Sequence, residues 1–192
     1  VYHVKANCES LDEVFAVLDK NPGVDLAEIC GGAGRTTIIA IRRKLRTGQN
    51  FDLVCGFDLT KRDQQHKVYQ YLNIYNVYCL VMAPICGPYG PLSHLNRVIN
   101  PESVKLLEAT ARPIAQFCGN CALIQLNSGR HFAQEQPHPS SLYQVAPWPR
   151  VFEYDAVTQV IYDRCMFGLQ VMSGQYKDMR NKKPSSMTAS HR

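Results

Sequence analysis

The sequence has few charged residues and no long apolar run. Of its 192 residues, 19% are charged and 45% are apolar, so the chain can bury a sizeable core and is not disordered by composition. Its longest apolar stretches, such as VYCLVMAPIC at 77–86, are far short of the roughly 18 to 20 residues that span a bilayer. We therefore expect no membrane segment.

The amino-terminal residues also lack two features. The opening VYHVKANCES has no apolar centre of the kind found in a signal peptide, which favours an intracellular location. The chain starts with Val rather than Met, which is typical of a fragment or a processed segment of something longer.

The eight cysteines do not form the pattern of a metal site. Cys118 and Cys121 have CxxC spacing, but no second CxxC and no HxxxH supplies two further ligands. Without a secretory signal, a reducing compartment is expected, and nucleus and cytoplasm are not distinguished. We expect no metal.

Strands and helices alternate along residues 24–137. The strands are apolar throughout, which is typical of a mostly parallel sheet covered by helices on both faces. We therefore predict an α/β fold. The strands are predicted at 24–29, 51–60, 77–84 and 130–137, with one or two more within 152–168; the helices are predicted at 9–20, 35–48, 61–76 and 100–129, the last kinked or divided at Pro113.

We expect one domain over residues 1–176, followed by a basic, flexible tail over 177–192. The formal net charge is +5, and much of the excess comes from RRKLR at 42–46 and from the tail. Such a charge permits contact with nucleic acid but does not require it, because a solvated helix face is equally basic. Trp148, between two prolines, is predicted to lie at the surface in a turn. Nothing indicates the oligomeric state.

The predicted strand ends carry the features that could bind a ligand. In open α/β sheets, ligands lie outside the carboxyl ends of the strands. The features there are the glycine loop CGGAG at 30–34, Asp58, the segment PICGPYG at 84–90, and Glu135.

The glycine loop fits neither common phosphate motif. No lysine follows Gly34 as a GxxxxGK[ST] loop requires, and the GxGxxG spacing is missing. What remains is either a structural turn or a loop for a nucleotide-like ligand, with Asp58 placed to accept hydrogen bonds from ribose hydroxyls. Phe57 could flank an adenine, and Glu28 either caps the loop amides or contacts the ligand.

Cys86 follows a buried strand in a loop dense in proline and glycine. A cysteine there is a nucleophile if a helix start or a cation stabilises its thiolate. The alternative is a structural cysteine in a tight turn.

Three segments together resemble class I S-adenosylmethionine-dependent methyltransferases, and most of all the DNA cytosine-5 methyltransferases. EICGGAGRTT at 28–37 is similar to their first motif, APICGPYGPLS at 83–93 to their Pro-Pro-Cys loop, and AQEQP at 133–137 to their Glu-Asn-Val motif. Ile85 replaces the second proline, Gln136 and Pro137 replace Asn-Val, and no Gln-x-Arg-x-Arg follows Glu135. DRCMFG at 163–168 and KKPSS at 182–186 are similar to methyltransferase-like segments of mobile-element polyproteins.

The resemblance implies a Rossmann-like methyltransferase fold, S-adenosylmethionine as cofactor, and DNA as a partner. Cys86 would attack C6 of an extruded cytosine, and Glu135 would contact N3. The alternatives are a noncatalytic, nucleic-acid-associated module, and a methyltransferase for another substrate in which Cys86 is structural. The implied cofactor-binding residues are Glu28, Cys30, Gly31, Gly32, Gly34, Phe57, Asp58 and Pro84.

Overall fold

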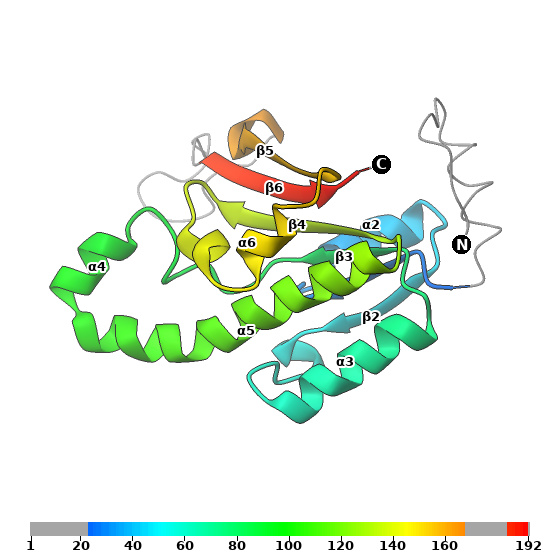
Figure 1. Ribbon diagram of the computed structural model, residues 1–192, viewed down its shortest axis with the longest axis horizontal. Coiled ribbons are helices and arrows are strands. Elements are labelled where there is room, and N and C mark those ends of the chain that lie inside the picture. The colour runs from blue at the N-terminus through cyan, green and yellow to red at the C-terminus, as the bar shows by residue number, and fades with distance from the viewer. Residues whose placement is uncertain (1–22, 168–183, 192) are drawn as a thin grey trace.

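The computed structural model describes residues 23–167 and 184–191, and its centre is one six-stranded sheet (Figure 1). The strand order is β2-β1-β3-β4-β6-β5. The first four strands are parallel, whereas β6 is antiparallel to both β4 and β5. This confirms an α/β fold with a mostly parallel sheet. The strands are β1 (Leu26–Ile29), β2 (Thr47–Phe51), β3 (Cys79–Met82), β4 (His131–Pro137), β5 (Val157–Asp163) and β6 (Pro184–Ser190).

Helices cover both faces of the sheet. Glu28 bonds to a helix on one face, while the next residue, Ile29, packs against the core on the other, because successive strand residues point to opposite sides. The helix on the first face is α2 (Arg35–Arg42). The other helices are α3 (Arg62–Ile74), α4 (Ser93–Ile99), α5 (Pro101–Asn127) and α6 (Trp148–Val151), joined by the short 3₁₀ turns η1 (Leu53–Cys55), η2 (Ser141–Gln144) and η3 (Arg164–Phe167).

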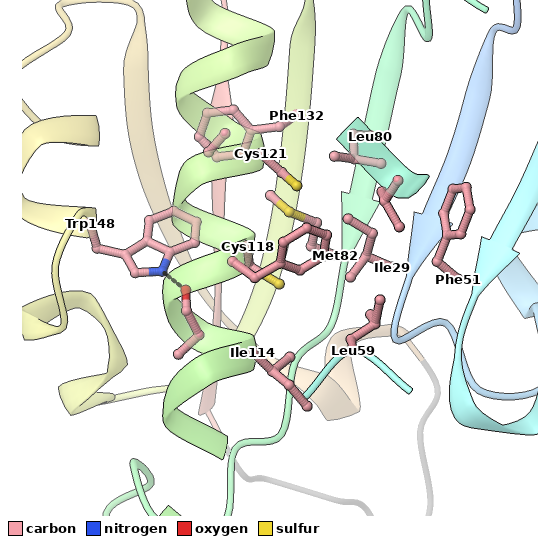
Figure 2. Packing of buried hydrophobic residues seen from close by; sticks show 14 of the residues in the cluster. Ile29, Phe51, Leu59, Leu80, Met82, Ile114, Cys118, Cys121, Phe132 and Trp148 are labelled. Carbon is pink, nitrogen blue, oxygen red and sulfur yellow. Dashed lines mark hydrogen bonds between the residues drawn. The ribbon is translucent and has the colours of Figure 1, made fainter. Parts of the chain in front are cut away.

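The core lies between the sheet and α5, as Figure 2 shows. Met82 and Phe132 from the strands meet Cys118 and Cys121 from the helix. Trp148 closes one side and is fully buried, and its indole N–H donates to the Ala115 carbonyl at 2.9 Å. The prediction that Trp148 lies at the surface is therefore wrong.

Gly119 explains how the tryptophan can lie so close to α5. A Cβ at this position would come 2.8 Å from Cδ of Pro147 and 3.2 Å from Nε1 of Trp148. The missing side chain on the helix makes room for the Pro-Trp-Pro segment, which therefore packs inward.

The second strand lies earlier than its sequence predicts. The helix predicted to reach Gly48 ends at Arg42, and Lys44 has a left-handed backbone with φ of 60°. Arg46 then binds the buried Asp25 carboxylate through its backbone N–H at 2.8 Å and through its guanidinium. These contacts fix residues 47–51 beside β1. The strand predicted at 51–60 is wrong, since it begins at the last residue of β2 and runs into a turn.

Two further predictions need correction. Pro113 lies inside α5 but does not divide it, because the helix is continuous from Pro101 to Asn127. Residues 184–190 of the predicted flexible tail form β6 in the interior of the sheet, where Ser186 and Thr188 are fully buried. Small hydroxyl side chains suit this position between two strands, although their polarity suggested a tail. The predicted helix at 9–20 and the boundary at 176 lie outside the described residues.

Within residues 23–167 and 184–191, none of the helices combines the length and apolarity needed to cross a bilayer.

Replacing Trp148 with Ala tests the packing of α6 on α5. It removes a fully buried indole and its hydrogen bond, so we expect unfolding free energy to fall by about 3–5 kcal/mol. Urea unfolding measures this. Phe152→Ala, at the half-exposed edge of the same aromatic group, is the control and should lose about 1 kcal/mol or less. Equal losses would contradict the described packing.

Candidate functional site

The parallel strands bring the predicted site segments to one edge of the sheet. Ile29, Met82 and Gln134 lie in one row across β1, β3 and β4. The residues that follow them are Cys30, Ala83 and Glu135, and the Ala83 N–H donates to the Ile29 carbonyl at 3.0 Å. The glycine loop, the Cys86 loop and Glu135 are therefore neighbours at this carboxyl edge.

The glycine loop is tied to the end of β2. The Gly31 N–H donates to Oδ1 of Asn50 at 3.2 Å, and the Asn50 amide donates back to the Gly32 carbonyl at 3.0 Å. The Gly32 N–H donates to Oδ2 of Asp52 at 2.9 Å. Neither Asn50 nor Asp52 was predicted as a site residue. The strand was predicted at 51–60, which put Asn50 and Asp52 at its start, whereas β2 ends at Phe51 and puts them at its carboxyl end.

Each glycine in the loop has its own reason. At Gly31 a Cβ would lie 2.8 Å from Oδ1 of Asn50 and 2.9 Å from the Glu28 side chain, so there is no room for one. Gly32 and Gly34 have φ of 53° and 63°, the left-handed region that favours glycine. A Cβ at Gly32 would meet nothing within 4 Å, so this backbone faces open space.

Glu28 supports the loop from beneath. Gly34 is the residue at the start of α2 and has no side chain to cap the helix, and the buried Glu28 carboxylate takes that role. Its Oε2 accepts from the Thr37 N–H at 2.9 Å and also from the Thr37 hydroxyl. Glu28 was predicted to cap the loop amides or to contact the ligand; in the structure it caps α2 instead, because the loop N–H groups of Gly31 and Gly32 are taken by Asn50 and Asp52. A contact with the ligand stays a prediction.

Two acids follow β2. Asp52 comes directly after the strand, and its carboxylate also accepts from the Val54 N–H at 3.0 Å. Asp58 lies beyond η1 at the surface, and its carboxylate accepts from the Thr60 N–H and hydroxyl and pairs with Lys61 at 3.3 Å. The Thr60 hydrogen bonds, and then Lys61, lower the pKa of Asp58. It is an exposed anion near the start of α3.

The Phe57 ring packs against the edge of the core and is not free at the surface. The ring is partly buried and meets Phe51 edge to face, with centroids 5.0 Å apart. A role beside an adenine stays a prediction.

Three buried thiols lie at the glycine loop: Cys30 is its first residue, and Cys118 and Cys121 belong to α5. Burial raises the pKa of Cys30 to about 12, with a smaller contribution from Asp52, and burial raises the pKa values of Cys118 and Cys121 well above normal. Such thiols are neutral and inert at ordinary pH. Among the described residues, no group of three or more His, Cys, Asp or Glu side chains could hold a metal ion.

The Cys86 loop is held firmly, but its thiol is exposed. The Cys86 carbonyl accepts from the N–H groups of Tyr89 and Gly90, each at 3.0 Å. Before it, the Pro84 carbonyl accepts from the amide of Gln136 at 3.0 Å, which joins this loop to the end of β4. The thiol therefore projects from a fixed backbone.

Arg164 holds the Glu135 carboxylate. Its guanidinium donates to Oε1 of Glu135 at 2.9 Å and to the Ser185 hydroxyl at 2.6 Å. Both side chains of the ion pair are about one-third exposed, 31% for Glu135 and 29% for Arg164. Tyr162 lies near the pair, and its pKa is raised by burial and, to a smaller extent, by Glu135.

Arg164 was not among the predicted site residues, because the resembled motif has its arginines in a Gln-x-Arg-x-Arg segment, which this sequence lacks after Glu135. The available signal was an arginine directly after a predicted late strand, but it reaches Glu135 only because β6 pairs with β5 on one side and with β4 on the other.

Two methyltransferase structures are similar to this chain at low sequence identity. No family model matches the chain, and no curated protein matches it. Among solved structures, S. pombe Dnmt2 methyltransferase is 8% identical with a TM-score of 0.49, over 88% of this chain and 49% of that one. An antibiotic-related methyltransferase is 13% identical with a TM-score of 0.41, over 100% of this chain and 96% of that one. The chain spans about half the length of the Dnmt2 structure.

The sheet itself has a Rossmann-like α/β topology. Four parallel strands in the order 2-1-3-4 are followed by the reversed strand β6 and then, at the edge, by β5, which runs in the same direction as the first four.

The two kinds of glycine in the loop should respond differently to substitution. Gly31→Ala places a Cβ against Asn50 and Glu28, so we expect a loss of about 1–3 kcal/mol in unfolding free energy. Gly32→Asn is the matched variant, because Asn tolerates the left-handed region and has space there, and it should lose less than about 1 kcal/mol. Thermal or urea unfolding compares them; a larger loss for Gly32→Asn would contradict the loop geometry.

Alkylation of the native protein should separate exposed from buried thiols. We expect Cys55 and Cys86 to react with iodoacetamide, and Cys30, Cys118 and Cys121 to be protected. Because the thiolate is the reactive form, raising the pH from about 7 to about 9 should leave Cys30 unmodified. Peptide mass spectrometry provides the measurement, with urea-unfolded protein as the control. Labelling of Cys118 before Cys86 would show that the core differs from the one described.

Proposed function

We propose that this chain transfers a methyl group from S-adenosylmethionine to C5 of cytosine in DNA. The observation that carries the proposal is the meeting of a glycine loop, an exposed thiol in a fixed loop, and an arginine-bound carboxylate at one edge of a methyltransferase-like sheet. These are the groups that a thiol-dependent attack on a pyrimidine requires.

The glycine loop is compatible with the proposed cofactor. The backbone at Gly32 faces open space, so a ligand can approach it closely, whereas Gly34 provides the left-handed turn that begins α2. Gly31 has a supporting role, since its neighbours fill the space beside it. Asp58 is the proposed partner of the ribose, because a carboxylate accepts more hydrogen bonds than Thr60 and Lys61 supply. The bound cofactor would supply an electrophilic methyl group on sulfonium.

In the proposed reaction, the Cys86 thiolate adds to C6 of the cytosine, which makes C5 nucleophilic. Glu135 contacts N3 and favours its protonation as the C6 bond forms. C5 would then take the methyl group of the sulfonium donor, which would leave as a neutral thioether. Transfer of the C5 proton to water expels the Cys86 thiolate, and return of the N3 proton to solvent leaves the neutral aromatic ring. Arg164 keeps the Glu135 carboxylate in one position and adds positive charge near the developing anion. The base must leave the duplex for Cys86 to reach it.

A second candidate is a noncatalytic, nucleic-acid-associated module with the same fold. Two departures from the catalytic motifs favour it. Ile85 stands where the resembled motif has its second proline, and Gln136, which stands where that motif has Asn, has its side-chain amide bound to the Pro84 carbonyl. A methyltransferase acting on another substrate is the third.

Covalent trapping tests the proposed nucleophile. We expect the chain, incubated with S-adenosylmethionine and duplex DNA containing 5-fluorocytosine, to form an adduct that survives denaturation, because fluorine at C5 prevents release of the thiol. Cys86→Ser should abolish the adduct. Cys55→Ser removes another exposed thiol and should leave it unchanged. Glu135→Gln should slow trapping at least about tenfold.

The control for trapping is calorimetric titration with S-adenosylmethionine. Binding that is weakened by Asp58→Ala but gives no adduct would favour the second or third candidate. An adduct that persists in Cys86→Ser would rule out Cys86 as the nucleophile. Absence of any cofactor binding would overturn the proposed methyl transfer.

A further inference from the structure

α2 lies on the face of the sheet opposite α5 and packs against β1 and β2 (Figure 1). Its inner side is narrow: Ala40 is buried, and Thr37 is bound to Glu28. Isoleucine is among the residue types most often fully buried. All three isoleucines of this helix are nevertheless exposed, with exposed fractions of 45% for Ile38, 56% for Ile39 and 58% for Ile41.

These isoleucines share one outward face of the helix. Successive residues of an α-helix are about 100° apart, so Ile38 lies about 200° around the helix from the buried Ala40 and points away from the sheet. Ile39 and Ile41 lie about 100° to either side of Ala40 and flank Ile38. Nothing in residues 23–167 and 184–191 buries this side of α2.

The same face carries unpaired cations. Arg35 and Arg42 are seven residues apart, about two turns, so they lie in one line along the helix beside Ile38. Arg43 and Lys44 continue the positive charge into the turn after the helix. Among the described residues, none of these four cations forms an ion pair. We call the exposed side of the helix the α2 outer face; it consists of Arg35, Ile38, Ile39, Ile41 and Arg42.

The chain itself contains a segment complementary to the α2 outer face. Residues 9–20 lie outside the described part, and their sequence, ESLDEVFAVLDK, predicts a helix with an apolar side that includes Phe15 and Leu18. Asp12 and Asp19 are seven residues apart and lie along one border of that apolar side. Two acids bordering an apolar stripe thus match two arginines bordering an apolar face, at the same spacing.

The described chain begins beside this face. The Asp25 N–H donates to the Arg46 carbonyl at 2.8 Å, so the start of β1 lies next to the turn that follows α2. Only residues 21–25 separate the predicted helix from β1. A connection this short gives an effective concentration of about millimolar. A helix over residues 9–20 would be about 18 Å long, enough to cover α2, which is about 12 Å long.

We propose that residues 9–20 form an amphipathic helix that docks on the α2 outer face, with Asp12 beside Arg35 and Asp19 beside Arg42. Both helices then end at the same edge of the sheet, as the short connection to β1 favours. Arg42 has an acidic partner in the same chain rather than a nucleic-acid phosphate. Because α2 begins directly after the glycine loop, the docked helix also supports that loop. The proposal does not depend on the proposed function.

Amide hydrogen exchange of the full chain, read by mass spectrometry of peptic fragments, tests the docking. In the wild type, residues 9–20 should exchange at least about tenfold more slowly than a synthetic peptide of the same sequence. Ile38→Glu should return them to the rate of the free peptide, because a charge would be buried under the docked helix. Ile74→Glu, at a residue on α3 that is 71% exposed, is the matched control and should leave the protection unchanged.

A charge exchange tests the pairing of the two helices. Arg42→Asp should reduce the protection of residues 9–20, because it places two acids together. Asp19→Arg in the same chain should restore it, which a purely structural role of Arg42 in α2 does not explain. Circular dichroism establishes that each variant is folded, as the exposed positions of Ile38 and Arg42 favour.

Four outcomes would overturn the proposal. The first is exchange of residues 9–20 at the free-peptide rate in the wild type. The second is protection that survives in both Ile38→Glu and Arg42→Asp, and the third is a charge exchange that restores nothing or an equal loss in Ile74→Glu. The fourth is protection that appears only when the chain is raised from about 1 to about 50 µM, which would show that a second copy provides the segment.

Discussion

The site depends on one buried carboxylate. Glu28 lies at the end of β1 and accepts the N–H and hydroxyl of Thr37, so it caps α2 where the chain has glycine instead of a capping side chain. An anion is well placed there, because the start of a helix carries partial positive charge and unpaired N–H groups. The same side chain fills the space beside Gly31. One residue thereby fixes both the direction of α2 and the path of the loop before it.

The loop in turn is hydrogen-bonded to the end of β2, and this second strand is where sequence and structure differ most. The alternation of apolar segments was sufficient to predict the α/β class, the parallel sheet, β1, β3 and β4. It was not sufficient to place β2, because TGQNF has no apolar run and its position is fixed by the Asp25–Arg46 contacts, which are 21 residues apart. β6 was missed for a related reason. PSSMTAS is stabilised by two neighbouring strands, and its own composition is that of a tail.

The candidate site was predicted in outline, since Cys86 and the glycines follow strands, and Glu135 lies near the end of one, at the same edge of the sheet. The residues that support them could not be predicted in the same way. Asn50 and Asp52 hold the glycine loop only because β2 ends at Phe51. Arg164 reaches Glu135 across a sheet pairing that no local pattern encodes. Local chemistry thus indicates the reactive groups, and long-range pairing determines the residues that orient them.

The place of β6 also has a consequence for the order in which the molecule is completed. During synthesis, the four parallel strands and α5 are available to pack long before residues 184–190 exist, and domains form progressively as chain emerges. The Arg164 guanidinium, however, donates to two groups, the Glu135 carboxylate and the Ser185 hydroxyl on β6, and the second of these holds it in place beside Glu135. A nascent chain can therefore have its glycine loop and its exposed thiol in place while the Glu135 carboxylate beside them is not yet bound by Arg164. The strand that is made last therefore completes the contacts that position the carboxylate of β4.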